Sequence, residues 1–263
     1  MAKQRGIIKL TGSMDGLTFY KAYGKNLVRK TRGPSKKQIM SGANFQRTRE
    51  HISEFGACSK ISTSFRSSLG ELKPLTDGQF GNRLTKLFTF VTRHDEGVRG
   101  QRPIKLSSHR KEFRDFECNI KYKLAKAIPG SFTISHNTER TAASVTIHGA
   151  QSRAIEGPEG ATHFQLVHAL SLVSDFVYQR KSKGYGPAEP YLNTMRNIQY
   201  SDYFSLEDEV LPEYTSTVSL GVTSPLPDSI SVVHAIGISF FQKVASVYHP
   251  FKQGNALKVV EIF

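Results

Sequence analysis

The chain has 263 residues, of which 38% are hydrophobic and 10% aromatic, with no Trp. This composition excludes a disordered chain, and the chain is long enough for one large or two ordinary domains. The formal net charge is +14, and residues 1–110 carry nearly all of it, with 22 Lys and Arg against 7 Asp and Glu; residues 111–263 contain 14 against 15. Such asymmetry indicates a polyanion partner, which could be nucleic acid, an anionic surface or an acidic protein. A basic surface that serves only solubility is the alternative.

The N-terminus and the cysteines restrict the cellular setting. The short apolar run after the charged start is interrupted by Lys9, so neither a signal peptide nor a membrane anchor is expected. No window approaches the ~18 apolar residues of a spanning helix, and a cytoplasmic protein is therefore expected. Cys58 and Cys118 are predicted to be buried free thiols. No Cys and His cluster is spaced to hold zinc, and no cofactor is expected.

Residues 6–32 predict a small antiparallel sheet of three short strands, 6–13, 17–23 and 25–32, because Asp15-Gly16 is a hairpin signal between β-prone runs. Phe19 is expected to pack on the helix that follows. Tyr20 and Tyr23 are candidates for stacking on bases. The candidate contacts to nucleic acid or another polyanion are all cationic: Lys21, Lys25, Arg29, Lys30, Arg32, Lys36, Lys37, Arg47 and Arg49.

Two amphipathic helices are predicted next, at residues 44–65 and 77–93. The first has apolar side chains at helical spacing, which are Phe45, Ile52, Phe55, Cys58, Ile61 and Phe65. Its other side is basic. The second helix has Phe80, Leu84, Leu87 and Val91 at similar spacing, so the two helices are expected to pack as a hairpin through these apolar sets.

From residue 113 onward the sequence changes to seven or eight short β-rich runs separated by turn clusters, a pattern typical of a two-sheet sandwich. The polar segment around residue 105 is a predicted boundary. We therefore expect an α+β protein with a basic β/helical module at 1–105, formed by a small sheet and a helical hairpin. An Ig-like antiparallel β-sandwich is expected at 106–263, with a long insertion near 183–210.

Several short segments together resemble a family of uncharacterised Bacteroidota proteins, a domain of unknown function. The segments are 6–10 (GIIKL), 19–21 (FYK), 45–50 (FQRTRE), 54–56 (EFG), 83–85 (RLT), 161–164 (ATHF), 237–242 (GISFFQ) and 248–257 (YHPFKQGNAL). The resemblance runs from end to end but thins between residues 171 and 230. It implies an N-terminal β/helical module followed by an Ig-like β domain, and it carries over no catalytic residues.

No pattern indicates catalysis, and the protein is not expected to be an enzyme. His51 and Glu54 have the H-x-x-E spacing, but no further ligand converges on them, so a capped or solvated helix surface is favoured over a metal site. The acidic cluster Glu207, Asp208 and Glu209 lies in a predicted loop, where a solvated tip is the ordinary outcome. No phosphate-binding glycine loop or nucleophile elbow occurs.

Two functions fit these features. The first is a non-catalytic protein whose basic N-terminal module docks on nucleic acid or another polyanion while the β-sandwich contacts a further partner. The alternative is a subunit of a self-assembling filament, tube or phage-like particle, held by exchange of a β-strand and by charge complementarity with the stretch at 207–209.

Overall fold

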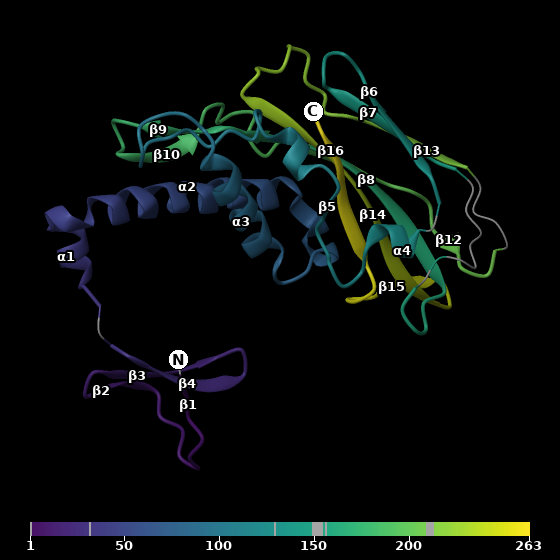
Figure 1. Cartoon of the computed structure of the whole chain (residues 1–263). Coiled ribbons are helices and arrows are strands. Elements are labelled where there is room, and N and C mark those ends of the chain that lie inside the picture. The colour runs from purple at the N-terminus through teal and green to yellow at the C-terminus, as the bar shows by residue number, and fades with distance from the viewer. Residues whose placement is uncertain (1, 32, 129, 149–154, 156, 209–212) are drawn as a thin grey trace. The chain divides into compact units, whose positions relative to one another are not determined.

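The computed structural model describes residues 2–31, 33–128, 130–148, 155, 157–208 and 213–263. The chain divides into two compact units, Met1–Glu50 and His51–Phe263 (Figure 1). This division falls earlier than the boundary predicted near residue 105, which stays a prediction. The α+β class is confirmed, since an N-terminal antiparallel sheet is followed by helices and several further antiparallel sheets.

The first unit contains a four-stranded antiparallel sheet with the strand order β1-β4-β3-β2. Its strands are β1 (Ala2–Lys3), β2 (Gly12–Met14), β3 (Leu17–Ala22) and β4 (Lys25–Lys30). The hairpin predicted at Asp15-Gly16 is confirmed, and both residues have the positive φ angles that a tight turn of this type requires. Tyr23 and Gly24 form the second such turn, also with positive φ.

The predicted first strand, 6–13, is largely wrong. Residues 4–11 are not in a strand, and the chain pairs instead through β1 and β2 on either side of them. The Gln4 side chain holds this loop, since its amide donates to the Leu27 carbonyl at 3.1 Å and its Oε1 accepts from the Leu10 amide at 2.9 Å. The apolar Ile7 and Ile8 that suggested a strand are exposed.

A short helix, α1 (Lys36–Ser41), follows this sheet in the sequence and belongs to the same unit. Ser35 caps it in a capping box, with the Ser35 hydroxyl accepting from the Gln38 amide and the Gln38 side chain accepting from the Ser35 amide. A 3-10 turn, η1 (Ala43–Phe45), leads into α2 (Gln46–Ser68), which continues into the second unit.

The second unit is built on a seven-stranded antiparallel sheet with β8 (His163–Ser174) and β14 (Ile230–Val244) at its centre. These two strands pair over their whole shared length, from Ile230 opposite Ser174 to Phe241 opposite His163. The other strands of the sheet are β5 (Phe116–Glu117), β11 (Arg196–Tyr200), β12 (Phe204–Ser205), β15 (Val247–Pro250) and β16 (Ala256–Ile262).

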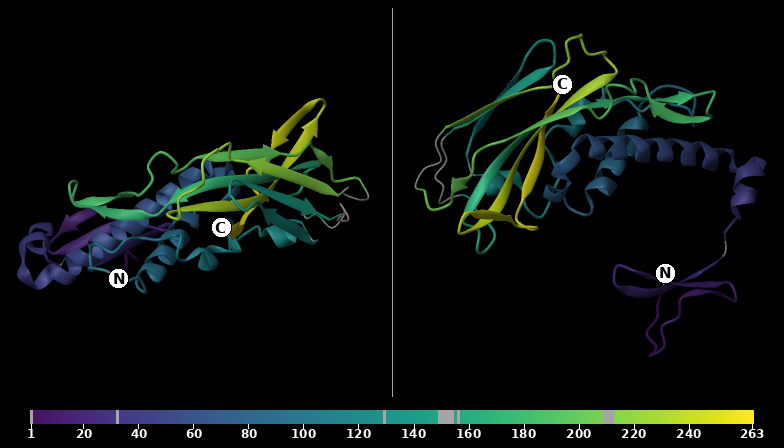
Figure 2. Two further views of the ribbon diagram at one scale, coloured as in Figure 1. Left: turned by 90° about the horizontal axis from the view of Figure 1, so that it is seen from above. Right: turned by 180° about the vertical axis from the view of Figure 1, so that it is seen from behind.

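Each face of this sheet is covered by a different layer (Figures 1 and 2). Helices α2 and α3 (Phe80–Thr92) lie on one face, where Val167, Ala169 and Val233 join their core. On the other face Leu166, Ile236 and Ile238 pack with Val145 of a three-stranded sheet. That sheet consists of β6 (Phe132–His136), β7 (Ala142–Ile147) and β13 (Tyr214–Ser219).

Both predicted helices are confirmed, but their predicted contact is partly wrong. Cys58, Ile61 and Phe65 are buried against the core that includes α3, whereas Ile52 and Phe55 remain 51% and 53% exposed. Helical spacing shows only that these residues lie within a broad arc of the helix surface, and it does not show which part of that arc is buried. In α2 the buried part includes Glu54 and leaves out Ile52 and Phe55.

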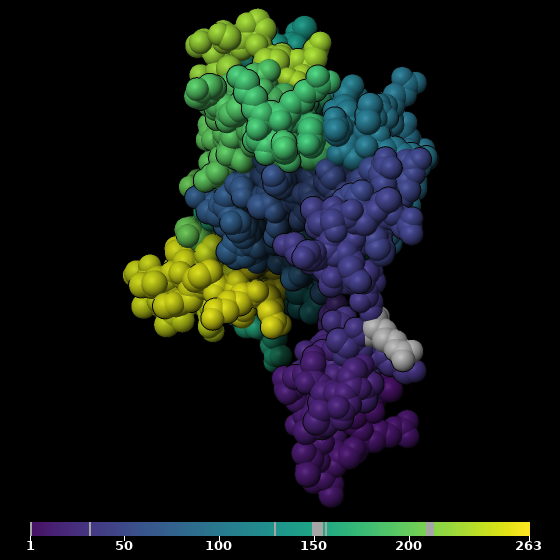
Figure 3. All heavy atoms as spheres, turned by 90° about the vertical axis from the view of Figure 1, so that its left-hand side faces the viewer, coloured from purple at the N-terminus to yellow at the C-terminus, as the bar shows by residue number. Residues whose placement is uncertain are grey.

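The stretch 183–210, predicted as a long insertion, supplies strands to the fold. In addition to β11 and β12 it contains β10 (Gly184–Pro187), which pairs with β9 (Phe176–Gln179). Figure 3 shows this green segment beside the blue helices, and Lys60 of α2 donates to the Tyr185 carbonyl at 3.1 Å. The remaining short helices are η2 (Gly70–Leu75), η3 (Arg110–Phe113) and α4 (Leu124–Ala127).

Candidate polyanion-binding surface

The strand register distributes the predicted basic contacts over both faces of the N-terminal sheet. Side chains of residues paired across neighbouring strands point to the same face, and successive residues alternate between faces. One face, here called the Tyr20 face, carries Thr18, Tyr20, Ala22, Lys25, Leu27 and Arg29. The opposite face, here called the Phe19 face, carries Leu17, Phe19, Lys21, Asn26, Val28 and Lys30.

The Tyr20 face combines charge with an aromatic ring. The Arg29 guanidinium carbon lies 5.5 Å from the centre of the Tyr20 ring, within the range of a cation–π contact. Lys3 pairs with Leu27 and therefore adds a further cation to this face. Tyr23 lies outside both faces, in the turn before β4, and its side chain is 92% exposed. Lys25 and Arg29 are exposed, so a ligand can reach the charged groups of this face.

The Phe19 face carries two of the predicted contacts, Lys21 and Lys30, and both are exposed. Phe19 itself is only half-buried and belongs to no core cluster among the described residues. The expected packing of Phe19 on the following helix stays a prediction. The Phe19 face accordingly offers two cations beside a partly accessible aromatic ring.

The remaining predicted contacts differ in whether their side chains already bind other groups of the chain. Lys36 and Lys37 are exposed in the first turn of α1. Arg47 forms an ion pair with Glu50 at 2.8 Å, and Arg49 donates to two carbonyl oxygens, those of Ile39 and Gly42, at 2.8 and 2.7 Å. Arg49 therefore ties the segments before α2 together. Arg32 lies outside the described residues.

The N-terminal unit is strongly basic, and its described residues form no buried interior. Residues 1–50 contain 12 Lys and Arg against 2 Asp and Glu, and none of the described residues in this range is buried. Ile7, Ile8, Leu10 and Met14 are exposed apolar side chains of the same unit. A sheet without a buried layer is marginally stable in water, so a partner that covers one of its faces would stabilise it.

A buried histidine pair, which sequence analysis did not find, lies between the large sheet and the three-stranded sheet. The Nε2 atoms of His168 and His234 are 2.9 Å apart, and His168 Nδ1 lies 3.0 Å from the Ser216 hydroxyl, which donates to Gln199 Oε1. Because that hydroxyl is a donor to Gln199, His168 Nδ1–H donates to it and His234 Nε2–H donates to His168. Both rings are then neutral.

Burial lowers the pKa of His168 to about 4 and that of His234 to about 3, the latter with further repulsion from His168 and His136. His234 Nδ1 is buried without a hydrogen-bond partner among the described residues. His163 and His168 lie five residues apart on β8 and therefore on opposite faces, whereas the register with β14 brings His168 to His234.

Glu54 is buried rather than solvated, which corrects the expectation for the His51 and Glu54 spacing. Its Oε1 accepts from the Gly100 amide and from Arg102 Nε, both at 2.8 Å, and its Oε2 accepts from Arg102 Nη2 at 2.7 Å. Burial raises the pKa of Glu54, but the hydrogen bonds from Arg102 and Gly100 outweigh it and hold that pKa below its usual range. This carboxylate fastens α2 to the segment after α3.

Within the described ranges, no group of His, Cys, Asp or Glu side chains is placed to hold a metal ion. Cys58 and Cys118 are free, buried thiols, as predicted, and burial raises the pKa of each. Among the helices that the structure describes, none has the length and apolar character needed to cross a membrane. Glu207 and Asp208 lie in an exposed bend, whereas Glu209 falls outside the described residues.

In comparisons with known proteins, no family model, no curated protein and no solved structure matches this chain. The resemblance to the Bacteroidota family stays a prediction based on the short segments named above.

Proposed function

We propose that the protein is a non-catalytic binding protein whose N-terminal unit, Met1–Glu50, docks on a polyanion, and that this polyanion is nucleic acid. The observation that carries the proposal is the combination of a net charge of +10, from 12 cationic and 2 anionic residues, with the absence of any buried residue in the described part of 1–50. An anionic partner supplies both the countercharge and the cover.

The Tyr20 face is the better candidate for direct contact. Lys3, Lys25 and Arg29 bring three cations to one side of the sheet, and the Tyr20 ring with the Arg29 guanidinium over it supplies planar groups next to them. Sheets that bind single strands combine these elements, since cations follow the phosphates while planar groups stack on bases. We assign Lys21 and Lys30 of the Phe19 face to a second, purely electrostatic role.

The β-rich remainder is proposed to contact a further partner and to have the form of an Ig-like sandwich. What supports this part is the packing of the three-stranded sheet β13-β7-β6 on one face of the large sheet, with Val145 and Ile147 against Phe164 and Leu166. The helices on the other face of the large sheet are an addition to that arrangement.

Binding of nucleic acid is tested by reversing equal amounts of charge at three places. The variants are Lys25→Glu with Arg29→Glu on the Tyr20 face, Lys21→Glu with Lys30→Glu on the Phe19 face, and Arg180→Glu with Lys181→Glu as a control in the second unit. All six side chains are exposed, so the folds should persist. We expect the Tyr20-face variant to lose roughly tenfold or more in affinity for labelled DNA and RNA, and the control to change little.

Equal affinity of the wild-type protein and both N-terminal variants would refute the proposal. A larger loss for the Phe19-face variant would keep the polyanion but reject the Tyr20 face as the contact surface. Circular dichroism of each variant shows whether its secondary structure is intact, so that a loss of folding is not counted as a loss of binding.

A self-assembling subunit is the second candidate, and the edge of the N-terminal sheet favours it. Strand β1 pairs only with Leu27 and Val28, which leaves Arg29 and Lys30 of β4 without a neighbouring strand on that side among the described residues. An added strand from another molecule could pair there. Particles that grow with concentration in light scattering or electron microscopy would support assembly, and a monomer at high concentration would exclude it.

A further inference from the structure

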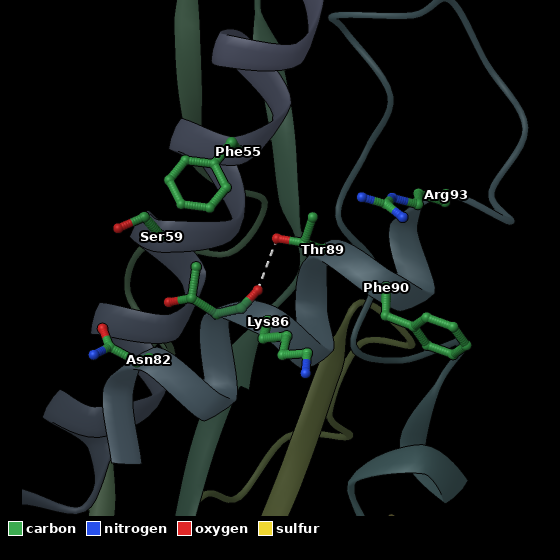
Figure 4. Close-up of a pocket in the computed structure, with 8 residues that line it drawn as sticks. Phe55, Ser59, Asn82, Lys86, Thr89, Phe90 and Arg93 are labelled. Atoms are coloured by element: carbon green, nitrogen blue, oxygen red, sulfur yellow. Dashed lines mark hydrogen bonds between the residues drawn. The ribbon is translucent and has the colours of Figure 1, made fainter. Parts of the chain in front are cut away.

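A groove of about 470 Å³ runs along the outer surface of α2 and α3, within the second unit (Figure 4). Phe55 and Ser59 of α2 line the groove, and so do residues along one side of α3 and the C-terminal cap of that helix. The α3 residues are Asn82, Thr85, Lys86, Thr89 and Phe90, and the cap is Arg93. At the rise per residue of an α-helix, the distance from Asn82 to Arg93 along α3 is ~16 Å, or about three turns. The groove therefore matches the length of a short helix.

The groove has exposed aromatic side chains on the solvent-facing sides of two helices, where polar side chains are usual. Phe55 and Phe90 are 53% and 58% exposed, although each belongs to a helix whose other side packs in the core. In Figure 4 the Phe55 ring lies on the α2 side, with Phe90 and Arg93 farther along α3. Exposed aromatic rings of this kind are typical of surfaces that receive a partner.

The polar side chains in the groove separate into two kinds. Thr89 donates to the Thr85 carbonyl at 2.8 Å and Asn82 donates to Gln79 at 2.9 Å, so these groups are satisfied within the helix. Lys86 and Arg93, in contrast, have no ion pair or side-chain hydrogen bond among the described residues, and no carboxylate lines the groove. The groove thus has two free positive charges and no negative one.

This charge pattern selects the class of occupant. A nucleic acid would gain little from a groove with two cations and two aromatic rings across ~16 Å. The exposed Ile7 and Ile8 of a second copy are disfavoured, because they are accompanied by Arg5 and Lys9, which Lys86 and Arg93 would repel. A partner segment that is acidic and carries an apolar anchor satisfies both features.

We propose that the groove between α2 and α3 binds an acidic amphipathic helix of a partner protein. Lys86 and Arg93 are seven residues apart on α3, which is about two turns, so the partner helix carries carboxylates about seven residues apart. One or two large apolar residues between these carboxylates pack against Phe55 and Phe90, in the manner of a helix in a groove. This site does not depend on the proposed binding of nucleic acid by the N-terminal unit.

The test uses the full-length protein and a phage-displayed library of random dodecapeptides, panned at raised salt to weaken binding to the basic N-terminal unit. We expect enriched peptides to contain carboxylates about seven residues apart with an aromatic or aliphatic residue between them. In fluorescence anisotropy, Phe55→Ala and the pair Lys86→Glu with Arg93→Glu should each weaken binding of these peptides by about tenfold or more.

Three variants separate this site from the N-terminal unit. Lys25→Glu with Arg29→Glu, and the control Arg180→Glu with Lys181→Glu, should leave peptide affinity unchanged, because these residues do not line the groove. Loss of binding in the first of these variants, or full binding in Lys86→Glu with Arg93→Glu, would overturn the proposal. Enrichment of basic peptides, or of no peptides, would also overturn it. Competition by DNA would show that the peptides bind the N-terminal unit, and this result too would overturn the proposal.

Discussion

At the scale of single residues, two buried polar side chains depend on partners that are distant in the sequence. Glu54 is buried because Arg102 and the Gly100 amide bind both of its oxygens. The sequence could not show this, because Arg102 lies 48 residues away and no periodicity links the two. The same holds for His168, whose partner His234 lies on another strand.

The histidine pair makes stability depend on pH. The folded-state pKa of each ring is lowered, to about 4 for His168 and about 3 for His234, below the value of about 6.5 expected in the unfolded chain. The unfolded chain therefore binds more protons, and the contribution of the pair is complete above pH ~6.5 and is lost as the pH falls toward 4. From pH 7 to pH 5 the free energy of unfolding should fall on the order of 2 kcal/mol per histidine.

Urea unfolding at pH 7, 6 and 5 measures this dependence. The variant His234→Gln, which removes one of the two titrating rings, should show about half of the wild-type change, whether or not it is less stable at pH 7. The exposed His249 provides the matched control, since His249→Gln should keep the full change. A wild-type protein equally stable at pH 7 and pH 5 would contradict the neutral buried pair.

At the scale of elements, periodicity predicted the two long helices well, and their observed bounds differ from the expected ones by a few residues. It could not decide which edge of the apolar arc is buried, so Ile52 and Phe55 were placed in the core although they are exposed. Strands β8, β14 and β16 of the large sheet were predicted from short β-rich runs, whereas β11 and β12 lie in the stretch predicted as an insertion. The order of the strands was not predicted, because β8, β14 and β16 are paired by contacts distant in sequence.

Two glycines in these elements make opposite predictions for the same substitution. Gly56 lies within α2, and an added Cβ would meet no atom within 4 Å. Gly237 lies in β14, and an added Cβ would come within 2.8 Å of the Ala256 carbonyl oxygen. Gly56→Ala should therefore stabilise the protein by about 0.5–1 kcal/mol, through the higher helix propensity of alanine, and Gly237→Ala should destabilise it by about 1–3 kcal/mol.

Thermal and urea unfolding of the two variants, beside the wild-type protein, give these changes directly. Each variant serves as the control for the other, since both add one methyl group to the second unit. A destabilised Gly56→Ala protein would show that the outer face of α2 is not open as the structure has it, and an unchanged Gly237→Ala protein would contradict the close approach of β16 to β14.

At the scale of the whole molecule, charge and core belong to different parts of the chain. The first 50 residues hold 12 of the 36 Lys and Arg but only 2 of the 22 Asp and Glu, and the described part of them has no buried residue. The three core clusters all lie within His51–Phe263. The charge is therefore concentrated in a unit without a buried core among its described residues, and the well-packed core lies in the other unit.

The sequence predicted the basic surface but not its arrangement. Counting residues was sufficient to find the charge, and the Asp15-Gly16 signal was sufficient to find one hairpin. Which cations share a face depends on the register of β3 with β4, and this register separates Lys25 and Arg29 from Lys21 and Lys30. The hydrogen bonds of Arg49 to Ile39 and Gly42 likewise depend on the turn before α2.

The most direct test of the central proposal is the affinity of the full-length protein for labelled single- and double-stranded DNA and RNA, measured by fluorescence anisotropy across a range of salt concentrations. If the six exposed lysines and arginines at positions 21, 25, 29, 30, 36 and 37 contact phosphates, log K should fall linearly with log salt. The expected slope is about −4 for a single strand and about −5 for a duplex. Negligible binding at physiological salt, or a slope near zero, would contradict the proposal that the N-terminal unit docks on nucleic acid.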